Sequence, residues 1–240
     1  MEPVLLIRAD GDETFGVAPG AFAEAGAPTR IWDAIGGAEP APNLGSVSAV
    51  VLFGSSYNVE HADDHPFIEE VAALTADAVE RGTPFLGVCF GAQVLAWTLG
   101  SPVAKAPVRE VGFVPIRPEP GAAADPLLSG YADGDEVFQW HMDTFALPPG
   151  SVPLVRGDDV PNQAYRVGDR AWGVQFHFEI DAAEVDLWLD NYQAHGDLLA
   201  EWGKTPDTVR AESERHIATH EAKGRDVFRR FARVAREAGA

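Results

Sequence analysis

The chain contains 240 residues, of which 46% are hydrophobic and 23% are charged, a balance that fits a globular protein and excludes the disordered, collagen-like and fibrous classes. Its 37 acidic residues outnumber the 18 basic ones, and the formal net charge of −19 disfavours binding to nucleic acid or to an anionic membrane surface. This length favours one large α/β domain over residues 1–240 rather than two small domains.

The start of the chain carries no pattern typical of a targeting segment. Met1–Pro3 includes an acid, and the apolar run Val4–Ile7 is much shorter than a secretory signal requires. No run approaches the roughly 20 apolar residues of a membrane helix. The single cysteine, Cys89, excludes an intramolecular disulfide and fits a reducing compartment, so we expect a cytoplasmic protein. Cys89 itself is either a candidate nucleophile or a buried structural thiol.

Short apolar runs alternate with helical patterns in the first part of the chain. The runs are typical of buried strands, and they cover Val4–Arg8, Thr29–Ala34, Val47–Phe53 and Pro84–Val88. Apolar residues at helical spacing predict one helix over Pro66–Arg81 and another over Ala92–Leu99, which stops before a glycine. Strand and helix in this alternation predict a parallel sheet with helices on both faces.

The second part of the chain changes character after Ser101. It is rich in Pro and Gly, and its short β-like runs predict a small antiparallel extension of the sheet at Val111–Arg117, Glu136–His141, Val152–Val155 and Gln163–Val167. Ala171–His177 is typical of a last apolar strand. From Asp181 onward the pattern is helical, which predicts a C-terminal helical extension over about 181–240 within the same domain.

The segment Pro84–Gln93 has the pattern of a nucleophile elbow with cysteine in place of serine. An apolar strand leads into G-x-C-x-G and then into a helix. The small residues Gly87 and Gly91 let the chain turn sharply, and the start of the helix favours a thiolate and presents free N–H groups to an oxyanion. Gln93 lies one helical turn after Cys89 on the same face. The alternative is that the two glycines only allow tight packing around a core cysteine.

The end of the last apolar run carries a second candidate group. His177 and Glu179 are two residues apart, so they project to the same side of an extended chain, at the carboxyl end of the strand where open α/β sheets place their chemistry. A histidine there can accept and return a proton, and the carboxylate can hold its ring in the useful tautomer. The alternative is a surface pair in a loop.

Two blocks together resemble the signatures of class I glutamine amidotransferases: G-V-C-F-G-A-Q at 87–93 and Q-F-H-F-E at 175–179. The distance along the chain between the blocks also suits that family, and Leu52–Ser56 falls where its members carry a glycine motif on the oxyanion strand. Glu110–Phe113 and Phe138–Phe145 are similar to stand-alone members related to the amidotransferase half of GMP synthase. The resemblance implies a three-layer, flavodoxin-like α/β fold with an open, mostly parallel sheet.

Residue by residue, the resemblance implies a catalytic triad. Cys89 would be the nucleophile, His177 the acid and base, and Glu179 the carboxylate that orients the imidazole. It also implies oxyanion N–H groups at Ser55 and Phe90, and substrate contacts from Gly54, Gln93 and His141. For His141 and its neighbour Asp143, the alternative is a strand-end pair that holds a loop.

Two positions depart from the family pattern. Ser55 and Ser56 stand where the family usually has Gly and Pro, so an oxyanion loop that needs a flipped peptide forms less freely. Phe178 replaces the usual proline between His177 and Glu179 and reshapes the pocket rim. Neither change removes a reacting group, and both bear on substrate specificity and basal rate.

The implied reaction is attack of the Cys89 thiolate on the side-chain amide of glutamine, through a γ-glutamyl thioester that water then hydrolyses. It needs no metal or other cofactor, and the ammonia would pass to a separate synthetase partner. A second interpretation is a γ-glutamyl peptidase or hydrolase that uses the same triad on a γ-glutamyl compound. A third is a catalytically idle regulatory subunit.

Three weaker patterns suggest other ligands. The segment His61–His65 and the helical set Glu212, His216 and His220 contain metal-ligating residue types, but a charged helix start and a solvated helix face are the favoured interpretations. Gly203–Thr205 hints at a phosphate loop but lacks its first glycine. We therefore expect no metal site and no nucleotide site.

Overall fold

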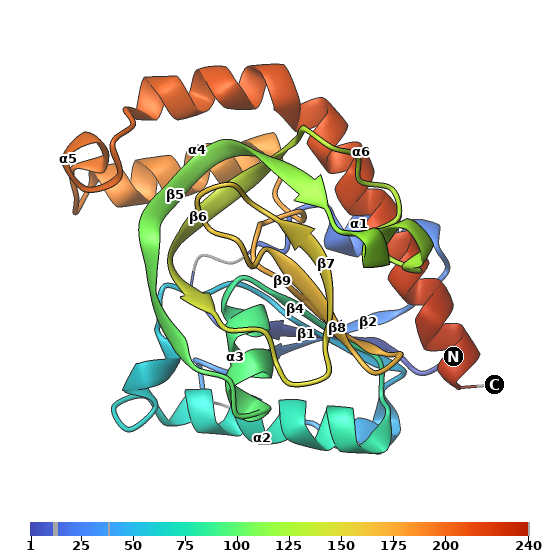
Figure 1. Cartoon of the computed structure of the whole chain (residues 1–240). Helices are drawn as coiled ribbons and strands as arrows, with labels where there is room; N and C mark the ends of the chain where they lie inside the picture. Colours follow the sequence, from blue (N-terminus) through green and yellow to red (C-terminus); the bar gives the residue numbers. More distant parts are fainter. Residues whose placement is uncertain (12–13, 38, 240) are drawn as a thin grey trace.

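The computed structural model describes residues 1–11, 14–37 and 39–239, and across them the strands form one nine-stranded sheet in the order β2-β1-β3-β4-β9-β8-β7-β5-β6 (Figure 1). The first five strands of that order run parallel. They are β2 (Thr29–Asp33), β1 (Val4–Arg8), β3 (Ala49–Leu52), β4 (Phe85–Val88) and β9 (Ala171–Val174). The predicted parallel strands are confirmed, and the fold is the predicted three-layer α/β type.

The other four strands pair antiparallel and extend the sheet beyond β9. They are β8 (Ala164–Val167), β7 (Val152–Arg156), β5 (Val103–Pro118) and β6 (Asp135–Phe145). Each predicted β-like run lies in or overlaps one of them, but β5 and β6 are much longer than the runs that indicated them. Their register shifts between Lys105 and Glu110, and this irregularity accommodates Pro107 within the long ladder.

Helices cover the parallel strands on both faces, as predicted. The helices are α1 (Ala18–Glu24), α2 (Pro66–Arg81), α3 (Phe90–Thr98), α4 (Ala182–Gln193), α5 (Leu198–Trp202) and α6 (Pro206–Ala238), with short 3-10 turns η1 (Leu44–Ser46), η2 (Val59–His61) and η3 (Pro120–Ala124). Figure 1 shows α2 and α6 on opposite sides of the parallel strands. The sequence pattern did not predict α1, which is only seven residues long.

Side chains of the parallel strands alternate between two cores. Val4 and Leu6 of β1 belong to the cluster shared with α1 and the C-terminal half of α6, whereas Leu5 and Ile7 belong to the cluster shared with α2 and α3. A third cluster joins β5 and β6 to α4, α5 and the first half of α6. The C-terminal helices therefore pack on the antiparallel strands as well as on the parallel ones.

The last strand is shorter than predicted. The prediction of a strand over Ala171–His177 is wrong after Val174, because the chain leaves β4 there. Gln175 N donates to Gln163 O, and His177 N donates to Phe138 O on β6. The segment therefore crosses from the parallel strands toward the antiparallel ones, and it carries the candidate histidine with it.

The helical region after Asp181 is confirmed, but it is divided into three helices. Asp181, Asp197 and Thr205 each cap the helix that follows by accepting a hydrogen bond from a main-chain N–H of its first turn. Gly203, with φ of 75°, ends α5. Within the described part of the chain, we find no helix with the length and apolar character needed to span a bilayer.

Candidate active site

Cys89 occupies the sharp turn between β4 and α3. Its φ of 47° and ψ of −102° make it one of two non-glycine residues with positive φ among the described residues. Glycine is the residue that normally adopts positive φ, so a cysteine held there carries backbone strain of the kind found at functional sites. The strained elbow predicted from G-x-C-x-G is therefore present.

The two flanking glycines are required by close main-chain contacts. A Cβ at Gly91 would overlap the carbonyl of Leu52 at the end of β3, and a Cβ at Gly87 would overlap the main chain of Gly91. The turn thus packs against β3 without any side chain between them. Phe90 begins α3 directly after Cys89, so its main-chain N–H has no acceptor within the helix.

His177 and Glu179 form a buried pair beside the elbow. His177 Nδ1 lies 2.6 Å from Glu179 Oε1, and both side chains are almost fully buried. Burial alone would lower the pKa of His177, but the Glu179 carboxylate and the Cys89 sulfur together raise that pKa well above its usual value. The raised pKa favours the protonated form of the imidazole, and Nε2 remains available to the sulfur or to a substrate.

Gly54 fills the narrow space between the two reacting groups. A Cβ on Gly54 would lie 2.7 Å from His177 Cε1 and 3.8 Å from Cys89 Cβ. Only glycine lets the loop after β3 approach both side chains so closely. The next residue is fixed by its hydroxyl, since Ser55 Oγ donates to Ala9 O at 2.6 Å. The loop after β3 is thus anchored to the loop after β1.

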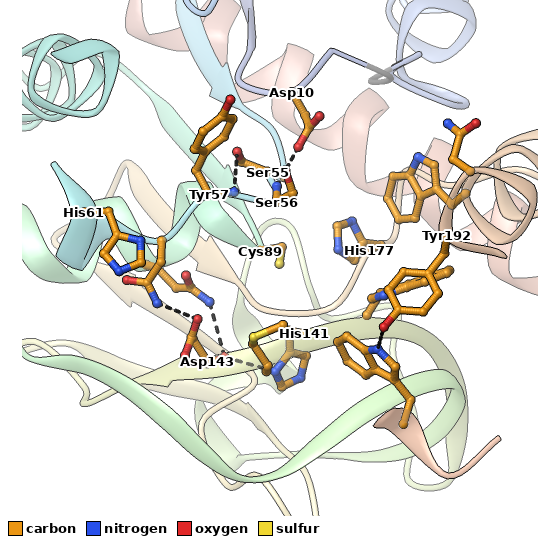
Figure 2. A pocket seen from close by; sticks show the side chains of 18 of the residues that line it. Asp10, Ser55, Ser56, Tyr57, His61, Cys89, His141, Asp143, His177 and Tyr192 are labelled. Atoms are coloured by element: carbon orange, nitrogen blue, oxygen red, sulfur yellow. Dashed lines mark hydrogen bonds between the residues drawn. The ribbon is translucent and has the colours of Figure 1, made fainter. Parts of the chain in front are cut away.

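Cys89 and His177 open into a single pocket with a volume of about 530 Å³ (Figure 2). In Figure 2, Cys89 lies at the centre of the pocket, with His177 and Tyr192 to one side and Tyr57 and His61 to the other. The pocket lies at the carboxyl ends of the parallel strands, where open α/β sheets bind their ligands. A buried structural thiol, which the sequence left open, does not fit a sulfur that lines a cavity.

A network of buried polar groups supports the floor of the pocket. Gln93 Nε2 donates to Asp143 O at 3.2 Å, and His141 Nδ1 lies 3.0 Å from the same carbonyl. His141 Nε2 lies 2.8 Å from Glu110 Oε2, and Asn58 Nδ2 donates to Asp143 Oδ2 at 2.6 Å. Gln93, His141 and Asp143 all line the pocket. Asp143 therefore holds Asn58, in the loop after β3, and both Asp143 and His141 line the cavity.

The sequence model of the glutamine amidotransferase class-I family matches residues 32–187, which include the elbow and the histidine segment. The chain belongs to this family. It is 38% identical over 148 residues to a glutamine-hydrolysing GMP synthase from Porphyromonas gingivalis, an alignment that covers 59% of this chain and 27% of that protein. The chain thus corresponds to about a quarter of the length of that relative.

Two solved structures are similar over nearly the whole length of this amidotransferase-family chain. A glutamine amidotransferase from Thermotoga maritima is 27% identical with a TM-score of 0.86, and the match covers 96% of this chain and 98% of that one. A glutamine amido transferase from Methylobacillus flagellatus is 28% identical with a TM-score of 0.87, covering 97% and 95%. The flavodoxin-like fold expected from the family resemblance is confirmed.

Sequence reasoning missed one polar side chain at the sulfur of this amidotransferase-family site. Gln175 Nε2 donates to Cys89 Sγ at 3.4 Å, and Gln175 Oε1 lies 3.4 Å from Gln93 Nε2. Gln175 was visible as the first letter of the Q-F-H-F-E block, but no spacing rule relates it to Cys89, because the two lie on adjacent strand ends.

In the part of the chain that the structure describes, no group of three or more His, Cys, Asp or Glu side chains is arranged to hold a metal ion. His220 Nε2 instead lies 2.7 Å from His177 O, and burial lowers the pKa of His220 to about 4. Glu212 pairs with Lys204 at 2.8 Å. Gly203 ends a helix. Of these residues, His220 contacts the segment that carries His177, whereas Glu212 also accepts a hydrogen bond from Phe113 N on β5.

Proposed function

We propose that this chain hydrolyses the side-chain amide of glutamine through a Cys89–His177–Glu179 triad. The observation that carries the proposal is the meeting of three features in one pocket: a strained cysteine elbow, an imidazole beside it and a buried carboxylate 2.6 Å from that imidazole. The relative named glutamine-hydrolysing GMP synthase supports glutamine as the substrate. The proposed reaction needs no metal or other cofactor.

In the first half of the reaction, the Cys89 thiolate attacks the amide carbon, and the carbonyl oxygen becomes an oxyanion. Main-chain N–H groups of Phe90 and Ser55 would stabilise that charge. His177 then gives its proton to the departing nitrogen, the C–N bond breaks, and ammonia leaves a γ-glutamyl thioester. Glu179 keeps the imidazole oriented and stabilises its charged form.

In the second half, His177 accepts a proton from water, the hydroxyl attacks the thioester, and glutamate leaves with the thiolate restored. We assign substrate contacts to Gly54, Gln93 and His141, because all three line the pocket close to Cys89. The polar side of the pocket, with Lys105 paired to Asp143 at 2.9 Å, would receive the charged amino-acid end of the substrate.

We further propose that the ammonia passes to a synthetase in the cytoplasm, since the matched relatives are named as synthases. The net charge of −19 argues against nucleic acid and anionic membranes as partners.

We also propose that residues 1–240 form a single domain, because α6 contributes Phe228 and Phe231 to the core that contains Val4 and Leu6.

The proposal is tested with an electrophilic glutamine analogue that alkylates nucleophilic cysteines. We expect stoichiometric labelling at Cys89, protection by glutamine, and release of equal amounts of glutamate and ammonia from glutamine. Cys89→Ala should remove both labelling and turnover while the thermal unfolding temperature changes little. A folded wild-type protein that neither labels nor hydrolyses glutamine, alone or with a synthetase partner, would favour the idle regulatory subunit.

A γ-glutamyl hydrolase is the second candidate function. It is favoured by the size of the pocket, because about 530 Å³ lies within the range of roughly 300–1,000 Å³ that holds drug-sized ligands, and glutamine fills only part of it. In this alternative the chemistry at Cys89 is unchanged, and only the group attached to the leaving nitrogen differs. Comparison of rates on glutamine and on larger γ-glutamyl amides separates the two candidates.

A further inference from the structure

One side of the pocket is lined by a group of large aromatic side chains, here called the aromatic wall. Its members come from β6, α4 and α5, and they are Trp140, Trp188, Tyr192 and Trp202. Trp140 is central, with its ring centroid 6.1 Å from that of Trp188, 5.7 Å from Tyr192 and 6.1 Å from Trp202. The rings form a continuous apolar surface on the cavity.

The aromatic wall begins at the catalytic imidazole. The rings of His177 and Trp188 meet edge to face, with centroids 4.9 Å apart and an interplanar angle of 81°. Figure 2 shows His177 and Tyr192 on the same side of Cys89, whereas Tyr57 and His61 lie on the opposite side. A molecule that reaches past His177 therefore meets the wall and not the polar side.

The direction of the substrate follows from the chemistry of the triad. The leaving nitrogen must lie within hydrogen-bonding reach of His177 to receive its proton. The γ-glutamyl part continues from the other side of the amide carbon, toward the polar side that contains Gln93 and Asp143. Any substituent on the leaving nitrogen is therefore directed along Trp188 and toward Tyr192.

The aromatic wall is fixed in place before any ligand binds. Trp202 Nε1 donates to Tyr192 OH at 2.9 Å, and the Arg109 guanidinium lies 5.5 Å from the centre of the Trp202 ring. Ammonia is too small to contact such a wall. Trp188, Tyr192 and Trp202 lie beyond residue 187, where the match to the family model ends.

We propose that the aromatic wall is a leaving-group subsite, and that the chain cleaves glutamines whose side-chain nitrogen carries an apolar aromatic substituent. This inference rests on the proposed Cys89–His177–Glu179 triad, and it names the substrate class of the second candidate function, γ-glutamyl hydrolysis. Cys89 forms the same γ-glutamyl thioester, the C–N bond breaks, and the amine departs with the proton of His177. Water then releases glutamate and restores the thiol, so no other reactant is needed.

The test compares three substrates on the purified chain by measuring the common product, glutamate: L-glutamine, γ-glutamyl-methylamide and γ-glutamyl-phenethylamide. The two amides both release alkyl amines, so they differ mainly in the phenyl group. Burial of such a ring contributes roughly 1.5–3 kcal/mol, about 10-fold to 100-fold in kcat/KM. A phenethylamide to methylamide ratio of kcat/KM above about threefold supports the inference, and a smaller ratio overturns it.

A matched pair of variants locates the preference on the wall. Tyr192→Ala should lower the phenethylamide to methylamide ratio at least threefold, while Tyr57→Ala, on the opposite side of the same pocket, should leave that ratio within twofold. An equal fall of the ratio in both variants overturns the inference. If glutamine is hydrolysed but the wild-type ratio stays near one, only the subsite is wrong. If none of the three substrates is cleaved, either by the chain alone or with a synthetase partner present, the proposed function fails as well.

Discussion

The two sides of the pocket are held together by different interactions. On the side of Cys89, main-chain atoms meet with no side chain between them at Gly87 and Gly91, and the main chain of Gly54 lies directly against the side chains of His177 and Cys89, so few residue types fit. On the aromatic side, large rings from three elements pack at centroid distances of 5.7 to 6.3 Å, and rings of similar size can replace one another. The close contacts around Cys89 therefore restrict the reaction, whereas the aromatic rings can be exchanged in ways that change which substrate binds.

The largest effect is expected where the triad depends on one carboxylate. Glu179→Gln removes the charge that orients His177, and kcat/KM should fall about 10³-fold to 10⁴-fold. Glu179 helps to raise the pKa of His177, so the imidazole of the variant should lose its proton at a lower pH. The alkaline limb of the pH–rate profile should therefore shift to lower pH. Glutamine hydrolysis measured across pH checks both effects.

Glu214→Gln, on the exposed surface of α6, is the matched control for the loss of one acidic side chain. It should leave both the rate and the profile unchanged. A Glu179→Gln enzyme that keeps more than a tenth of wild-type kcat/KM would contradict the proposed role of this carboxylate.

On the side of Cys89, a single added methyl group at Gly54 should strongly reduce activity. Gly54→Ala places a methyl group 2.7 Å from His177 Cε1, so the ring must move away from Cys89. Misplacement of a catalytic group by about 1 Å costs about 10²-fold in rate, so we expect a loss of this order. The unfolding temperature should stay nearly unchanged, because the obstructing atom belongs to a side chain that can move. In Gly130→Ala, where the nearest atoms would lie at ordinary contact distances of 3.5 and 3.7 Å, activity should be retained.

The catalytic side could be predicted from sequence because its constraints are local. G-x-C-x-G fixes the elbow within five residues, and the spacing of His177 and Glu179 places both on one side of the chain. The pair forms even though the strand ends at Val174, because His177 N is bonded to Phe138 O instead of to a neighbouring parallel strand. The spacing argument therefore succeeded for a segment whose secondary structure was mispredicted.

The aromatic side could not be predicted because its members are distant in sequence. Trp140 lies on β6, and Trp188, Tyr192 and Trp202 lie on two later helices, so no periodicity relates the four rings. The length of β5 was also missed, since Pro107 and the register shift after Lys105 interrupt the strand pattern. These features depend on how the C-terminal helices pack on the antiparallel strands.

A smaller effect should follow from removal of the donor at the sulfur. Gln175→Leu keeps the volume of the side chain but loses the hydrogen bond from Nε2 to Cys89 Sγ. A hydrogen bond to a charged group contributes about 1.5–3 kcal/mol, so alkylation of Cys89 by iodoacetamide should slow at least about tenfold. Gln193→Leu on the surface of α4 is the control, and equal alkylation rates in the two variants would exclude a role for Gln175 at the sulfur.

The smallest effect concerns stability at the point where the two sides meet, in the first turn of α4. Burial raises the pKa of Glu184 to about 7, hydrogen bonds from Thr14 oppose the shift, and the charge of Glu179 adds to it. The native state thus binds more protons than the unfolded state between about pH 4.5 and 7, and its stability falls as pH rises through that range. Glu184→Gln removes this titration.

The wild type should therefore lose about 2 kcal/mol of unfolding free energy between pH 5.5 and pH 8 that Glu184→Gln does not lose. The size follows because the raised pKa lies about 1.5 units above the lower pH. Urea unfolding at the two pH values measures the difference, with Glu70→Gln on the exposed face of α2 as control. If the difference in unfolding free energy between Glu184→Gln and the wild type is the same at both pH values, Glu184 is ionised throughout this range. Its burial then causes no pH-dependent loss of stability.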